Sequence, residues 1–98
     1  MICNKYVIYR LKNIRSYGFK DMSFEKFKRM KMIVERDYYK LYENTDEIVI
    51  VDRHIYDFLE RIFCLSEGSI HMGDIIEVLI DNKRELYFCN NIGWIRIN

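Results

Sequence analysis

The side chains that could perform catalysis or hold a metal ion are few and poorly spaced. His54 and His71 are the two histidines, and neither has a second histidine, a cysteine or a carboxylate at a metal-ligand spacing. Asp74 and Glu77 could form an acid–base pair, but Asp74 follows Gly73 directly before an apolar segment. That placement favours a turn in which the aspartate bonds nearby backbone N–H groups.

Known catalytic motifs are also missing from the sequence. It contains no G-x-S-x-G element, no glycine-rich phosphate loop and no H-E-x-x-H pair. We therefore expect a protein that is not an enzyme and that uses no cofactor or metal.

The three cysteines and the length of the chain indicate a compact protein of a reducing compartment. Cys3, Cys64 and Cys89 are far apart among apolar neighbours, which is typical of small buried hydrophobes. The sequence has neither a signal-peptide pattern nor an apolar run of roughly 18 residues that could cross a bilayer. We expect a single domain over residues 1–98 and a cytoplasmic location.

Charge is distributed unevenly along the chain although the net charge is only +1. Residues 1–31 contain nine Lys and Arg against two acids, and residues 32–98 contain seven against thirteen. This asymmetry has two interpretations. The chain could have a basic face that binds nucleic acid or the acidic surface of another protein, or its basic and acidic parts could lie against each other in the fold. The sequence pI of about 7.7 is below the value of about 9 that is common among nucleic-acid-binding domains. The candidate partner-binding residues are Lys26, Lys28, Arg29, Lys31, Arg15 and Lys20.

Hydrophobic periodicity predicts the elements that must position these residues. Expected strands cover residues 6–11, 38–42, 75–80, 86–90 and 94–97, with a loop over 13–20 and a hairpin turn at 81–84. Expected helices cover residues 24–34, capped by Ser23, and residues 53–64, capped by Asp52. Residues 48–51 fit either a short strand or the approach to the second helix. The predicted fold class is α+β: a small antiparallel sheet of about five strands with two helices and a C-terminal three-stranded meander.

Three tyrosines in the predicted strands have two possible roles. Tyr6, Tyr38 and Tyr42 could stack on nucleic-acid bases if they share a sheet face with lysines. They could equally occupy ordinary half-buried strand positions, because tyrosine has an apolar ring and one polar end.

The order of these segments resembles the YodL-like domain family. The segments that carry the resemblance are Tyr9-Arg10-Leu11, Tyr38 to Tyr42, Ile62-Phe63, Met72-Gly73-Asp74-Ile75-Ile76, and Tyr87 to Trp94. They are similar to the family's Tyr-Arg-Leu start, its Ser-Val-Ser-Asp-Val-Val strand entry and its Tyr-Tyr-x-Asp-x-x-Gly-Phe ending. Asn90 stands where the family often has aspartate, and Met72-Gly73 replaces Val-Ser.

The resemblance implies a small protein of plasmids, conjugative elements or phages that inhibits a host defence nuclease, such as a CRISPR effector, by binding it. The chain has no alanine, glutamine or proline and is rich in Ile, Lys, Asn and Tyr, which suits an AT-rich coding sequence of such an element. We favour an inhibitor whose basic helix covers a protein surface, or contacts guide RNA within a ribonucleoprotein, over one that mimics nucleic acid with an acidic face. The acids available for mimicry are Glu43, Asp46, Glu47, Asp52, Asp57 and Glu60. The alternatives to an inhibitor are a small RNA- or DNA-binding domain and an accessory protein of a conjugation apparatus.

Overall fold

A computed structural model describes residues 2–12, 23–49 and 55–98. In these ranges the strands are β1 (Ile2–Leu11), β2 (Tyr38–Asn44), β3 (Ile48–Val49), β4 (Ile75–Ile80), β5 (Lys83–Cys89) and β6 (Trp94–Arg96). The helices are α1 (Phe24–Arg29), α2 (Val34–Asp37) and α3 (Ile55–Leu65). The predicted loop over 13–20 and the predicted cap Asp52 lie outside the described residues.

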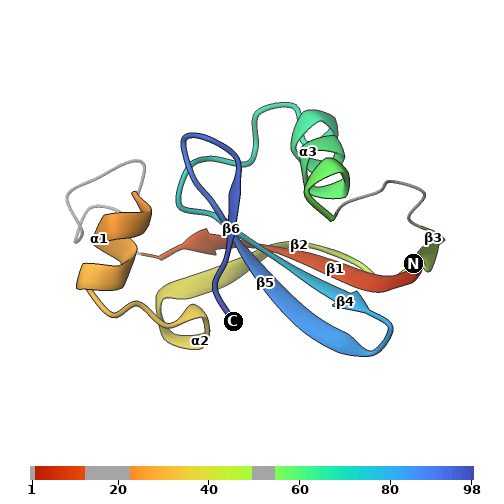
Figure 1. The fold of residues 1–98 in the computed structure, drawn as a ribbon, viewed down its shortest axis with the longest axis horizontal. Coiled ribbons are helices and arrows are strands. Elements are labelled where there is room, and N and C mark those ends of the chain that lie inside the picture. The colour runs from red at the N-terminus through yellow and green to blue at the C-terminus, as the bar shows by residue number, and fades with distance from the viewer. Residues whose placement is uncertain (1, 13–22, 50–54) are drawn as a thin grey trace.

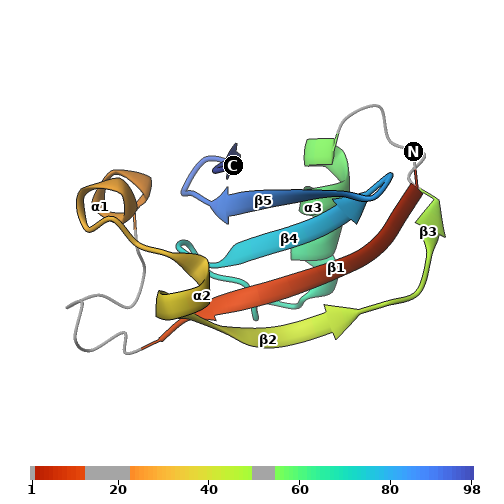
Figure 2. The same cartoon turned by 90° about the horizontal axis from the view of Figure 1, so that it is seen from below.

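The six described strands form one antiparallel sheet, which Figure 1 shows nearly edge-on. Five of them follow the order β2-β1-β4-β5-β6, and Figure 2 shows the first four side by side. The short strand β3 pairs with the first residues of β1, next to the end of β2. Strand β1 therefore lies inside the sheet, between β2 and β4. The predicted α+β class, the antiparallel sheet and the C-terminal meander β4-β5-β6 are confirmed.

Helices cover both faces of the sheet, and each face has its own apolar core. Figure 2 shows α3 behind the sheet, α2 in front of it near one end, and α1 beside that same end. Phe58, Leu59 and Ile62 of α3 belong to one core cluster with buried residues of β4 and β5. We call this side the α3 face and the opposite side the α1 face. Because both faces are covered, the central strands are rich in Ile and Val and do not alternate strictly with polar residues.

The core on the α1 face explains why one predicted helix is two. Residues 24–34 were expected to form a single helix, but α1 ends at Arg29 and α2 begins at Val34. Lys31 has a φ of 51°, which an α-helix does not allow. Met32 and Val34 are both buried beside Phe27 in the same cluster. A continuous helix would turn residues two apart to different sides, so burying both requires the break.

The hairpin between β4 and β5 is tighter than predicted. Asp81 and Asn82 alone form the turn, with φ angles of 49° and 65°. Such a two-residue turn matches the twist of the flanking strands, and Asp and Asn tolerate positive φ better than other residues that carry a side chain. Strand β5 accordingly begins at Lys83 and not at residue 86.

The remaining described boundaries lie within two residues of the predicted ones, except that β1 begins at Ile2, four residues before the predicted start of the first strand. Residues 48–51 begin as the short strand β3, and the described part of the second predicted helix is α3, which ends one residue later than expected. Cys3 and Cys89 are buried in the core on the α3 face, whereas Cys64 is exposed on α3. Within the described ranges no helix is long and apolar enough to cross a membrane.

Two tyrosines in the sheet make stability sensitive to alkaline pH. The Tyr9 hydroxyl donates to Glu77 Oε2 at 3.1 Å, and the Tyr87 hydroxyl donates to Glu85 Oε1 at 3.1 Å. Burial, followed by the charge of Glu77, raises the pKa of Tyr9 from 10.0 to about 12. Burial and the Glu85 carboxylate also raise the pKa of Tyr87.

We expect the melting temperature to fall as pH rises from 10 towards 12. A raised pKa means that the folded state holds these hydroxyl protons more tightly than the unfolded state, which stabilises the fold. That stabilisation is fully present below pH 10 and is lost as pH rises from 10 towards 12. Tm should be measured on both sides of pH 10 for the wild type and for the Tyr9→Phe, Tyr87→Phe double variant. The double variant should lose less stability over this window; identical pH profiles would contradict the prediction.

Candidate functional site

Basic residues of β1 are paired with acids within the fold. Lys5 Nζ lies 2.8 Å from Glu43 Oε1 of β2, and Arg10 Nη2 lies 3.5 Å from Asp74 Oδ2 at the entry to β4. The uneven charge of the sequence is therefore in part internal complementarity, as one of the two sequence-based interpretations proposed.

The basic residues on and just after α1 are arranged differently. Lys28, Arg29 and Lys31 are exposed, and no ion pair joins them to an acid in the described part of the chain. Lys26 is half-buried, and its pKa is lowered by desolvation and by the nearby Arg29 charge. Glu25 is the acid in the first turn of α1, so the segment carries more positive than negative charge. We call Lys26, Lys28, Arg29 and Lys31 the α1 basic surface. Arg15 and Lys20 lie outside the described residues.

Aromatic packing holds this surface on the sheet. The ring of Phe88 in β5 lies 4.9 Å from that of Phe27 and 5.5 Å from that of Phe24, measured between centroids. At the start of the helix, Ser23 Oγ accepts a hydrogen bond from Lys26 N–H at 3.3 Å, which confirms the predicted cap. Six residues are too few for a stable isolated helix, so the phenylalanine contacts must supply most of the stability of α1.

Residues 30–33 connect α1 to α2, and we call them the elbow. Asp37 Oδ2 accepts a hydrogen bond from Ile33 N–H at 2.8 Å. Arg36 Nη2 donates to Asp37 Oδ2 at 2.8 Å and to the Lys31 carbonyl at 3.1 Å. Because Asp37 is buried, this network fixes the path of the elbow from the inside. Sequence reasoning missed it, because Arg36 and Asp37 were expected to lie beyond the helix.

A second polar cluster joins β1 to the entry of β4. Asp74 Oδ2 accepts a hydrogen bond from His71 N–H at 2.8 Å, which is the turn predicted from the Gly73-Asp74 pair. The Arg10 guanidinium contacts the Ser69 carbonyl and lies 3.1 Å from His71 Nδ1. Arginine only donates, so His71 Nδ1 is the acceptor in this contact. Burial raises the pKa of Asp74, although the His71 N–H and Arg10 oppose that effect.

Asp74 and Glu77 do not form an acid–base pair. Asp74 contacts Arg10, whereas Glu77 accepts from the Tyr9 hydroxyl and pairs with Arg84 Nε at 3.1 Å. Tyr9 and Arg10 are successive residues of β1, so their side chains point to opposite faces of the sheet. In the described ranges no group of three or more His, Cys, Asp or Glu could hold a metal ion.

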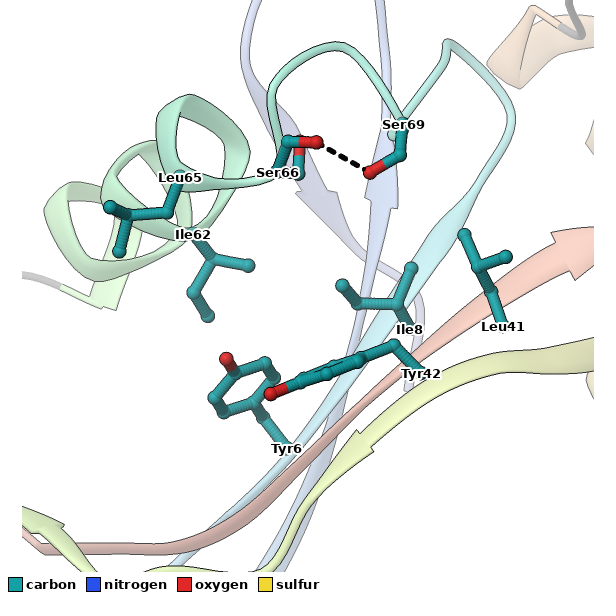
Figure 3. Close-up of a pocket in the computed structure, with 8 residues that line it drawn as sticks. All are labelled: Tyr6, Ile8, Leu41, Tyr42, Ile62, Leu65, Ser66 and Ser69. Carbon is teal, nitrogen blue, oxygen red and sulfur yellow. Dashed lines mark hydrogen bonds between the residues drawn. The ribbon is translucent and has the colours of Figure 1, made fainter.

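An apolar groove of about 430 Å³ lies on the α3 face, beside the edge strand β2 (Figure 3). Its lining residues are Tyr6, Ile8, Leu41, Tyr42, Ile62, Leu65, Ser66 and Ser69. A bulge creates one wall: Ile8 pairs with Tyr42 and Tyr9 pairs with Lys40, which leaves Leu41 as an extra residue on the same side as Tyr42. The lining has no charged side chain, so the groove suits an uncharged apolar group.

The three tyrosines considered for base stacking lie in two different environments. The rings of Tyr6 and Tyr42 both line the groove, with 5.7 Å between their centroids. No lysine is among the residues that line it. Tyr38 is 3% exposed, and its hydroxyl donates to the Gly73 carbonyl at 2.7 Å. The idea that Tyr38 could stack on a base is therefore wrong, because its ring is buried in the core.

The acids proposed for nucleic-acid mimicry are partly engaged with other residues. Glu43 contacts both Lys40 and Lys5, which lower the pKa of its carboxyl to about 2. Glu60 Oε1 accepts a hydrogen bond from Trp94 Nε1 at 3.0 Å. Asp52 lies outside the described residues. Two of the acids proposed for mimicry, Glu43 and Glu60, thus already have partners within the fold.

These features define a small α+β protein with an antiparallel sheet, a basic surface on one face and an apolar groove on the other. Comparison of the chain with protein-family models, with curated proteins and with solved structures returned no match.

Proposed function

We propose that this protein inhibits a host defence nuclease by binding it, with the α1 basic surface covering an acidic patch of the nuclease. One observation carries the proposal: Lys28, Arg29 and Lys31 are exposed and have no acid partner in the described ranges, whereas Lys5 and Arg10 of β1 are paired. Exposed like charges repel one another and weaken the isolated protein, and an acidic partner would relieve that repulsion.

The biological setting is inferred from the resemblance to YodL-like domains and from the amino-acid composition, which suits an AT-rich coding sequence. Both suit a small protein of a mobile element or phage that meets its target in the host cytoplasm. Covering a protein surface needs no catalytic group and fits the mixed charge of the chain better than mimicry, because Glu43 and Glu60 already have partners. The same cations also support a second candidate function, the binding of RNA or DNA.

Charge reversal tests the proposal. The wild type and a variant with Lys26, Lys28, Arg29 and Lys31 all replaced by glutamate should be expressed in a low-GC bacterium that carries active CRISPR and restriction nucleases. We expect the wild type to protect an incoming phage and the variant to lose this protection, with nuclease affinity reduced about a hundredfold or more, because acidic residues would then face acidic residues. Lys83→Glu is the matched control for Lys28→Glu. Lys83 is also exposed, but it lies at the hairpin between β4 and β5, at the end of the sheet away from α1 (Figure 2).

The outcomes separate the two candidates. If the variant with all four residues replaced by glutamate protects the phage as well as the wild type does, the α1 basic surface is not the binding site. A complex that disappears on nuclease digestion would favour nucleic-acid binding, in which affinity falls by about 0.7 to 0.9 log units per neutralised phosphate for each log unit of salt. Failure of the wild type to protect against every nuclease tested would reject the inhibitor.

A further inference from the structure

Two apolar side chains are exposed within the elbow, next to the basic residues. Met30 is 36% exposed and Ile33 is 49% exposed. Met32, which lies between them in sequence, is buried in the core on the α1 face. The buried side chain of Met32 thus anchors the elbow, and the side chains of Met30 and Ile33 are exposed to solvent. Arg29 and Lys31 are their neighbours in sequence.

The elbow is fixed before any partner arrives. Asp37 holds the Ile33 N–H, and Arg36 holds the Lys31 carbonyl. Binding therefore costs little ordering of the backbone here, which favours recognition of a defined shape.

The two acids that follow the elbow in sequence are already engaged. Glu35 Oε1 lies 3.1 Å from Arg84 Nη2, and Asp37 Oδ2 lies 2.8 Å from Arg36 Nη2. Neither carboxylate is left to neutralise Arg29 or Lys31. The surface around the elbow therefore combines positive charge with exposed apolar area.

Single-stranded nucleic acid would use this surface poorly, although its cations could still contact the phosphates of a duplex. Sequence-tolerant binding of single strands stacks bases on exposed aromatic rings between the cations. Phe27 is buried, and Lys28 Nζ lies 5.6 Å from the centroid of the Phe24 ring, over its face. Exposed methionine and arginine are instead enriched at protein–protein interfaces.

We propose that the elbow receives a protein segment in which acidic residues flank an apolar side chain. The acids would contact the α1 basic surface, and the apolar side chain would pack between Met30 and Ile33. This proposal rests on the proposed function, because it names the chemistry of the surface that the nuclease would present.

Binding of short labelled probes, followed by fluorescence anisotropy, tests the proposal. The probes are a glutamate-rich peptide with central leucines, a peptide of the same length with glutamates alone, and a single-stranded DNA. We expect the leucine-containing peptide to bind about tenfold more tightly than the acidic peptide, because it buries the two exposed side chains. The Met30→Ser, Ile33→Ser double variant should abolish that difference, and the Leu65→Ser, Ile92→Ser variant, which removes exposed apolar side chains elsewhere, should retain it.

The failures can be told apart when the Tm of each variant shows that it remains folded. Equal affinity for both peptides, tighter binding of DNA, or no binding of either peptide would overturn this proposal. If phage protection is lost on charge reversal while the peptides bind equally, the proposed function stands and only the elbow proposal fails. If charge reversal changes neither protection nor peptide binding, both fail.

Discussion

Replacing Phe88 by alanine is expected to remove about 4 kcal/mol from the free energy of unfolding and to release α1 from the sheet. Phe88 is 0% exposed and contacts both Phe24 and Phe27. Its loss leaves a cavity at the point where a six-residue helix depends on packing. A domain of this size has a total stability of roughly 5 to 15 kcal/mol, so the variant should lose a large part of its stability but remain folded without denaturant.

Urea unfolding followed by circular dichroism measures this effect. Ile92→Ala is the matched control, since Ile92 is 87% exposed at the turn between β5 and β6 and should change stability by less than about 0.5 kcal/mol. A Phe88→Ala protein as stable as this control would show that the phenylalanine cluster does not hold α1. Phe88→Leu, which keeps most of the apolar volume, should lose less and should retain partner binding.

Replacing Asp37 by alanine is expected to cost about 2 kcal/mol and to loosen the elbow. The change leaves the Ile33 N–H without its acceptor and removes the carboxylate that holds Arg36. Asp37 is buried, so water replaces the lost hydrogen bond poorly. The ion pair with Arg36 adds less, because the arginine side chain is 59% exposed and screened by solvent.

Amide hydrogen exchange measures the loosening of the elbow at a single residue, Ile33. The Ile33 amide should exchange roughly thirtyfold faster in Asp37→Ala than in the wild type, which corresponds to about 2 kcal/mol. Glu35→Ala serves as the control, because it removes a neighbouring carboxylate that contacts Arg84 and not the elbow backbone. Unchanged protection of Ile33 in Asp37→Ala would mean that the elbow is held by its apolar anchors alone.

The strands were predictable because their signal is local. Runs of β-branched and aromatic residues placed β4 at its observed bounds and β2 within two residues of them. The end of α1 was not predictable, because it depends on burying Met32 and Val34 against the distant strand β5. The start of β5 depends on backbone angles at Asp81 and Asn82 that allow a turn of two residues.

The candidate site was predictable in composition but not in its electrostatics. The cluster of lysines and arginines is visible in the sequence, yet Lys5 and Lys28 look equivalent there. Only the pairing of β1 with β2 places Glu43 beside Lys5. The exposure of Met30 and Ile33 was also not predictable, because it depends on the break between α1 and α2. In a continuous helix these side chains would point in other directions.

The position of β1 inside the sheet has a consequence for synthesis. Strand β1 is synthesised before the strands that flank it, and its inner neighbour β4 follows only after β2 and α3. Cys3 therefore cannot pair with Ile80 until β4 has been made. Val7 and Ile8, which the finished sheet buries, therefore stay accessible to chaperones and proteases until most of the chain has emerged. A translation product that stops before β4 lacks one of the two strands that enclose β1. We therefore expect nascent chains to remain protease-sensitive until residues 75–80 have left the exit tunnel.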